Sequence, residues 1–85
     1  MNARPFQRGD VVQLTSARTT MRAWVGFASP NGRSLMVFFD GAFPLASGGV
    51  LVQVMPLFQE DDGTFHDIVE RTPIAVELIK HESES

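Results

Sequence analysis

The chain contains no cysteine and no tyrosine, and it has only two histidines, His66 and His81. Without cysteine it can form neither a disulfide nor a thiolate metal site, and two histidines do not suggest structural zinc. It also lacks a signal-peptide pattern and any apolar run long enough to cross a membrane. These absences predict a cytoplasmic domain without membrane association, metal or cofactor.

The composition is that of an ordinary globular domain, because 44% of the 85 residues are hydrophobic and 20% are charged. A chain of this length buries only about 60% of its unfolded surface, so its core is thin. Small domains without disulfides often gain the missing burial by oligomerising. We expect one domain over residues 1–80 and a disordered tail over 81–85.

The charge is unevenly distributed along the chain. The net charge is −3, with +3 in residues 1–40 and −6 in residues 41–85. We expect the two halves to pair partly on one small domain. The alternative is a polar molecule that associates head to tail, or a basic face for an acidic protein partner.

An alternation of apolar and polar residues recurs throughout the chain, whereas the helical period is not sustained anywhere. Turn residues separate the alternating segments at 29–33, 59–63 and 70–73, and 42–49 reads as a loop. Strands are predicted at 10–15, 21–29, 34–39, 50–58, 64–69 and 74–79. Short strands joined by tight turns favour an all-β fold, a small SH3-like barrel of five to six antiparallel strands.

Two of these strands are apolar on both faces, at residues 35–39 and 50–55. One barrel interior can hold one face of each strand, and the expected core is Val12, Leu14, Val25, Phe27, Val37, Val52 and Val54. The apolar side chains that remain need cover; they are Met36, Phe38, Phe43, Leu45, Leu51 and Met55. We predict that they form a two-fold homodimer interface, with the loop at 42–48 as an alternative cover.

The first half of the chain carries a pattern of a Gly-Asp strand start, an apolar alternation, a serine, a methionine and a later aromatic-Asp-Gly, here Gly9, Asp10, Val12, Leu14, Ser16, Met21, Phe39, Asp40 and Gly41. This pattern resembles that of the YodC-like family of small bacterial proteins. The likeness covers residues 6–41, and the glycine pair that follows the serine in the family is Ala17-Arg18 here. Because that family is functionally uncharacterised, the resemblance implies a bacterial protein with a small barrel fold.

Residues 52–56 read Val-Gln-Val-Met-Pro. This run gives a second, fainter resemblance, to the pore-lining Val-Gln-aliphatic-Tyr-Pro run of type II dihydrofolate reductases, with Met55 at the tyrosine position. Those enzymes are short SH3-like barrels with a pore shared by four subunits. Leu14 and Thr15 replace the lysine pair that precedes the serine in that family. The cationic groups that would hold an anionic cofactor are therefore missing at that point.

Two other clusters carry chemistry-bearing residues. The acidic segment Glu60, Asp61, Asp62, His66 and Asp67 could hold a cation, but its spacing matches no calcium loop and fits a hairpin turn, so we assign no metal site. Arg22, Trp24 and Arg33 could form an aromatic and basic strip that binds a ligand or single-stranded nucleic acid. The isoelectric point near 5.1 argues against nucleic acid.

The sequence carries no nucleophile motif and no phosphate-binding loop, so we assign no catalytic residue. We predict a non-enzymatic binding module, a homodimer that self-associates through an apolar sheet face. The alternatives are a barrel that binds a small ligand or nucleic acid, and a pore-type oligomeric reductase.

Overall fold

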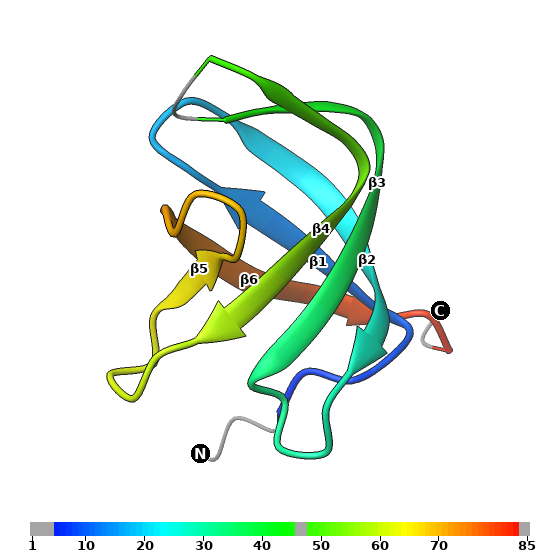
Figure 1. Ribbon diagram of the computed structural model, residues 1–85. Coiled ribbons are helices and arrows are strands. Elements are labelled where there is room, and N and C mark those ends of the chain that lie inside the picture. The colour runs from blue at the N-terminus through cyan, green and yellow to red at the C-terminus, as the bar shows by residue number, and fades with distance from the viewer. Residues whose placement is uncertain (1–4, 46–47, 84–85) are drawn as a thin grey trace.

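The computed structural model describes residues 5–45 and 48–83. The strands are β1 (Asp10–Thr15), β2 (Thr20–Ala28), β3 (Ser34–Pro44), β4 (Val50–Gln59), β5 (Phe65–Asp67) and β6 (Pro73–His81). Each strand pairs antiparallel with the next, and β6 returns to pair with β1, which closes the sheet into a barrel (Figure 1). This confirms the predicted all-β, SH3-like barrel.

Two of the predicted turns form as their residues indicate. In the β2–β3 turn, Gly32 has a φ of +72° and donates its N–H to the Ser29 carbonyl. In the β4–β5 turn, Gly63 has a φ of +92°, and the Asp62 carboxylate accepts the N–H of Thr64 at 2.9 Å. Glycine supplies the positive φ and the aspartate side chain closes the turn, so the acidic segment at 60–63 is a hairpin turn.

The inward faces of the strands form one core. Four of the predicted core residues are buried in it, namely Val12, Leu14, Val25 and Val37. Val54 is only partly buried, and Val52 lies outside the residues whose side chains the structure describes. The other buried members are Ala23, Leu35, Phe39, Phe43, Met55, Leu57, Phe65 and Ile74.

Phe27 is a correction to the predicted core, because its side chain is 55% exposed. Val25 faces Val37 across the β2–β3 ladder, but Phe27 faces Met36, so Gly26 is an extra residue in β2. A bulge of this kind reverses which side chains point inward. The alternation of residues 21–27 is regular in the sequence, and it cannot reveal the bulge.

The β3 strand extends to Pro44, so the first residues of the predicted loop at 42–49 belong to a strand. Phe38 faces Val54 and Ala42 faces Val52, and the register shift between these pairs is a second irregularity. The ribbon of β3 and β4 bends there over one end of the barrel (Figure 1). This bend carries Phe43 inward, where its ring centroid lies 5.7 Å from that of Phe39.

The two ends of the described chain meet at one corner of the barrel, which we call the Asp10 corner (residues 7–10 and 81–82). Gly9, with a φ of +93°, accepts the N–H of Glu82 at its carbonyl. The buried Asp10 carboxylate accepts the N–H of Gln7 and lies 2.9 Å from Nδ1 of His81. His81, predicted to begin a disordered tail, is therefore the last residue of β6; residues 84–85 lie outside the described residues.

Candidate functional site

The outer face of β2, β3 and β4 carries large apolar side chains, and we call it the apolar face (Trp24, Phe27, Met36, Phe38 and Pro56). Trp24 and Phe38 are each 44% exposed, and Met36 is exposed as well. These residues are cross-strand neighbours, since Trp24 faces Phe38, Phe27 faces Met36, and Met36 faces Pro56. Cross-strand partners on one face are in contact range, so the apolar surface is contiguous.

The bulge at Gly26 shapes this face. A Cβ atom placed on Gly26 would lie 2.2 Å from Cε1 of Phe38, so the Phe38 ring covers the glycine backbone. Only glycine permits this approach. Beside the ring lies an apolar groove of about 320 Å³, lined by Gly26, Phe27, Met36, Phe38, Pro56 and Ile68 among others.

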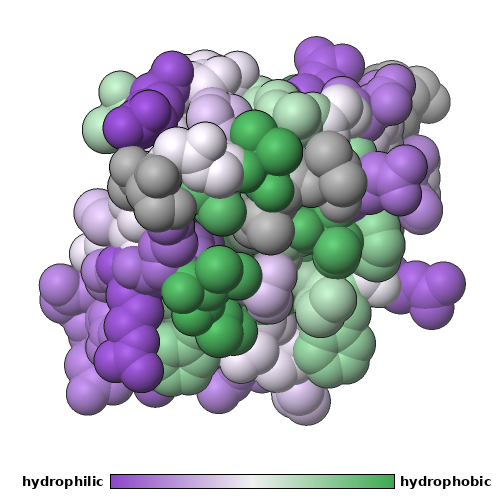
Figure 2. All heavy atoms as spheres, turned by 45° about the horizontal axis from the view of Figure 1, so that its top comes forward, coloured by the Kyte–Doolittle hydropathy of each residue, from purple (hydrophilic) through white to green (hydrophobic). Residues whose placement is uncertain are grey.

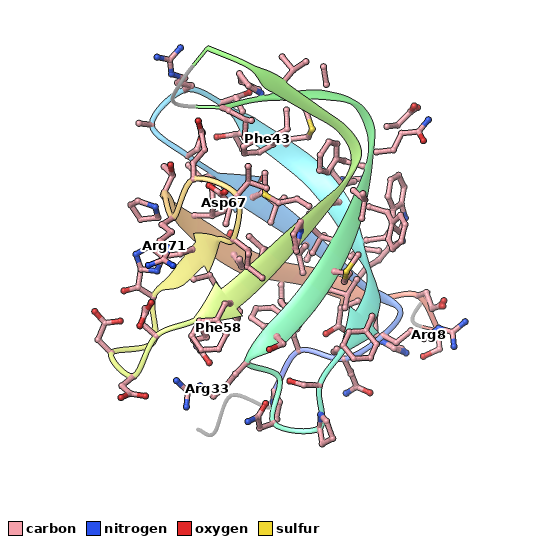
Figure 3. The ribbon with its side chains drawn as sticks, in the orientation of Figure 1. Arg8, Arg33, Phe43, Phe58, Asp67 and Arg71 are labelled. Carbon is pink, nitrogen blue, oxygen red and sulfur yellow. The ribbon has the colours of Figure 1, made fainter. Side chains whose placement is uncertain are left out.

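The predicted interface residues separate into two groups. Met36 and Phe38 lie on the apolar face, as the alternation indicated. Phe43 and Met55 are instead buried in the barrel core, and Leu45 is buried where β3 ends. They are corrections to the predicted surface, because the barrel itself covers them. Figure 3 shows Phe43 inside the upper end of the barrel.

The sixth predicted interface residue, Leu51, lies outside the residues whose side chains the structure describes. The same holds for part of the alternative cover at 42–48, because residues 46–47 are not described. The apolar face of β2–β4 is the part of the predicted interface that the structure supports as a surface. Figure 2 shows hydrophobic side chains exposed on one face of the molecule, among hydrophilic ones.

The predicted aromatic and basic strip is not a continuous one. Arg22 and Trp24 are both exposed, two residues apart on β2. Arg33 instead joins the β4–β5 turn, where its guanidinium donates to the Gln59 carbonyl at 2.9 Å and to Asp61 at 2.8 Å. The prediction that Arg33 belongs to this strip is therefore corrected. Arg33 links the β2–β3 turn to the β4–β5 turn, and Arg22 is the basic residue of the strip that lies near Trp24.

The carboxylates of the acidic segment have different structural partners. Asp61 pairs with Arg33, and the Thr64 N–H that bonds Asp62 lowers the pKa of that carboxyl below its ordinary value of 3.8. Within the described residues, no three histidine, aspartate or glutamate side chains are grouped as a metal site would require. The Asp67 carboxylate is buried and accepts the N–H groups of Glu70 and Thr72. We call residues 67–72 the Asp67 turn.

A pocket beside β5 brings together residues that the sequence analysis did not connect. It measures about 320 Å³ and is lined by Phe58, Glu60, His66, Asp67, Ile68 and Arg71. Arg71 is the residue that sequence reasoning missed, because it lies outside the acidic segment and no motif marks it. A wider hollow of about 600 Å³ lies near the N-terminal arm, and none of its lining residues is charged.

Comparison of the chain with protein-family models, with curated proteins and with solved structures gave no match. The two family resemblances in the sequence therefore stay predictions. Over residues 5–45 and 48–83, the structure has no helix of the length and apolarity needed to span a membrane.

Proposed function

We propose that the chain is a non-enzymatic binding module that self-associates as a two-fold dimer through the apolar face of β2, β3 and β4. The observation that supports this proposal is the cross-strand register of Trp24 with Phe38 and of Phe27 with Met36. The register places large apolar side chains next to one another on three adjacent strands. Exposed patches of this kind mark interaction surfaces.

The size of the face is consistent with the centre of a dimer interface. An aromatic side chain buries about 150–250 Å² when it is fully covered, so the half-exposed rings of Trp24, Phe27 and Phe38 each offer about 100 Å². Met36 and Pro56 belong to the same face and enlarge this apolar area. A stable dimer buries about 800 Å² per partner, of which a polar rim supplies the rest. The described surface of one chain is 5402 Å², which leaves room for such a rim.

A second copy of the chain is the occupant that we favour. A two-fold contact uses one patch twice, and aromatic rings on both sides can stack in offset or edge-to-face geometry. The small barrel also has a thin core, so dimer formation would add apolar burial that the single chain lacks.

The oligomeric mass in solution tests this proposal. Wild-type protein at about 100 μM, well above a micromolar Kd, should sediment at twice the 9.4 kDa of one chain. Phe38→Glu places a charge in the contact and should give the monomer mass. Ile79→Glu is the matched control, because Ile79 is 41% exposed on β6, which pairs with β1 and β5 and not with the strands of the apolar face, and it should leave the dimer intact. A wild-type monomer at this concentration would overturn the proposal.

The tryptophan provides a second measurement that does not depend on a charged substitution. Trp24 is the only tryptophan of the chain and lies at the proposed contact. Its emission should shift to shorter wavelength as the protein concentration rises through the dimer Kd, because the ring becomes less exposed. An emission maximum that does not depend on concentration, together with a monomer mass, would show that the apolar face binds no second copy.

A further inference from the structure

The pocket beside β5 has the size and composition of a small-molecule site. Its volume of about 320 Å³ lies at the lower end of the usual range for ligand pockets. Phe58 and Ile68 contribute apolar walls, and Glu60, His66 and Arg71 contribute polar groups. Asp67 also lines the pocket, but backbone N–H groups of its own turn bond to its carboxylate. In Figure 3, Phe58, Asp67 and Arg71 lie on the same side of the barrel, around β5.

The Asp67 turn holds Arg71 in an unusual backbone conformation. The Asp67 carbonyl accepts the Arg71 N–H at 2.8 Å, while its carboxylate accepts the N–H groups of Glu70 and Thr72. Arg71 consequently adopts a φ of +60°. This is the left-handed position that ends a helical turn, and glycine is the residue that usually occupies it.

The left-handed conformation makes an arginine less stable than glycine at this position, so we looked for a role of the Arg71 side chain. Non-glycine residues persist in the left-handed region where surrounding bonds fix them, and they are frequent at ligand-binding sites. Among the described residues, no hydrogen bond or ion pair engages the Arg71 guanidinium. The guanidinium is thus available to a ligand in the pocket that it lines.

His66 supplies a second polar group with unmet capacity. Its Nδ1 atom is buried and, within the described part of the chain, has no hydrogen-bond partner. A proton on Nδ1 would be a buried donor without an acceptor, so the tautomer with its proton on Nε2 is favoured. Nε2–H is then the donor of the imidazole ring, and His66 lines the pocket.

The remaining walls are held in place by the rest of the fold. Glu60 is fixed by the β4–β5 turn, since its N–H donates to the Thr64 carbonyl and its own carbonyl accepts the N–H of Gly63. The Phe58 ring is held from one side by Arg33, whose guanidinium carbon lies 5.8 Å from the ring centroid. The backbone of Glu60 and the ring of Phe58 are therefore held by contacts with residues outside the pocket.

We propose that this pocket binds a small aromatic carboxylate that also carries a hydrogen-bond donor. The carboxylate would pair with the Arg71 guanidinium, which matches it with two parallel N–H groups, and accept the Nε2–H of His66. The ring would lie against Phe58 and Ile68, and the donor at its far end would bond to Glu60. Ile68 also borders the groove beside the apolar face, but Glu60, His66 and Arg71 are not part of that face, so either proposal can fail without the other.

The test is a titration of the ¹⁵N-labelled protein with 4-hydroxybenzoate, followed by amide chemical shifts. We expect saturable shifts at Ile68 and Arg71 with a Kd of about 1 mM or tighter, which is typical of so small a compound. The neutral analogue 4-hydroxybenzamide should bind at least about tenfold more weakly, because it cannot form the charged pair with Arg71.

Arg71→Gly separates binding from folding. Glycine suits a φ of +60°, so the unfolding midpoint of this variant should equal or exceed that of wild type. Its affinity for 4-hydroxybenzoate should fall at least about tenfold. Arg8→Ala is the control, because Arg8 is an exposed cation at the opposite side of the barrel, and it should leave the affinity unchanged (Figure 3).

Three results would overturn the proposal: no saturable shift up to about 10 mM, ten times the expected Kd; shifts that centre on other residues; or equal affinity of wild type and Arg71→Gly. Phe38→Glu protein should bind the probe as wild type does. Loss of dimer formation without loss of probe binding would leave this proposal standing while the proposed dimer is tested separately.

Discussion

The Asp10 corner and the Asp67 turn both centre on a buried aspartate, but the partners of the two carboxylates differ. Asp10 is 0% exposed and accepts the N–H of the nearby Gln7, but its carboxylate also lies beside His81, which is 71 positions away in the chain. Asp67 is 1% exposed, and the described bonds of its carboxylate reach only the backbone N–H groups of Glu70 and Thr72. The Asp10 carboxylate therefore connects the first strand of the barrel to the last, whereas the Asp67 carboxylate stabilises the turn that directly follows it in the chain.

The Asp10 carboxylate thus contributes to closure of the barrel, and the Asp67 carboxylate contributes to the formation of a local turn. A backbone N–H cannot move away from its acceptor without unfolding the turn, whereas the partly exposed His81 side chain can turn toward water. Buried donors that lose their acceptor are destabilising, so the two aspartates should respond differently to the same substitution.

The largest expected effect is that of Asp67→Ala. It removes a charged acceptor from the N–H groups of Glu70 and Thr72, and each such bond contributes about 1.5–3 kcal/mol. We expect the free energy of unfolding to fall by about 3–4 kcal/mol in urea denaturation. Asp67→Asn keeps one acceptor oxygen and should lose about half as much. A loss below about 1 kcal/mol for the alanine variant would show that water replaces the carboxylate.

A pair of glycines measures how crowded the Asp10 corner is. Gly9 and Gly63 have φ angles of +93° and +92°, so alanine is strained equally at both. A Cβ atom on Gly63 would meet nothing within 4 Å, whereas one on Gly9 would lie 2.8 Å from Glu82 and 2.9 Å from His81. We expect Gly63→Ala to cost about 1 kcal/mol and Gly9→Ala about 2–3 kcal/mol. Equal losses would mean that residues 81–82 move aside at no cost.

Asp10→Ala should destabilise the Asp10 corner more than the rest of the barrel. We expect a loss of stability of about 2 kcal/mol, because the Gln7 N–H loses its acceptor. The loss should be smaller than at Asp67, because the other partner, His81, can turn to water. Hydrogen exchange gives the sharper measurement. The Glu82 N–H, which bonds to Gly9, should exchange about tenfold faster relative to a core amide such as that of Val37. In Asp67→Ala this ratio should not change.

The contrast between local and distant contacts also explains what the sequence could predict. The fold class and the turns at Gly32 and Gly63 were predictable because turn residues and alternation are local signals. The bulge at Gly26 was not, since it reverses the alternation without changing the residue pattern, and it places Phe27 outside the core. Phe43 and Met55 were assigned to the surface for a related reason, because the bend of β3 and β4 folds that surface inward.

The candidate sites follow the same rule. Met36 and Phe38 were predictable as an outward apolar pair because they alternate with buried neighbours. The pocket beside β5 was not, because the φ of Arg71 depends on a carboxylate that no sequence pattern identifies as buried. Local periodicity predicts which side chains share a face, and it does not predict where that face bends or what covers it.

The smallest expected effect is at Asp62, whose carboxylate bonds to a backbone N–H in the same way as that of Asp67 but lies at the surface. The Thr64 N–H favours the charged carboxylate and lowers its pKa from 3.8. A group with a lowered folded-state pKa stabilises the fold above its unfolded pKa, and this contribution disappears as the pH falls through the folded value. The effect should therefore be present at neutral pH and lost below about pH 4.

A ¹³C titration of the Asp62 carboxyl in the folded protein should give a midpoint below 3.8, and Asp62→Asn should remove only this acid-dependent part of the stability. A midpoint at or above 3.8 would mean that water competes successfully for the Thr64 N–H, and that only burial makes the similar bonds of Asp67 strong.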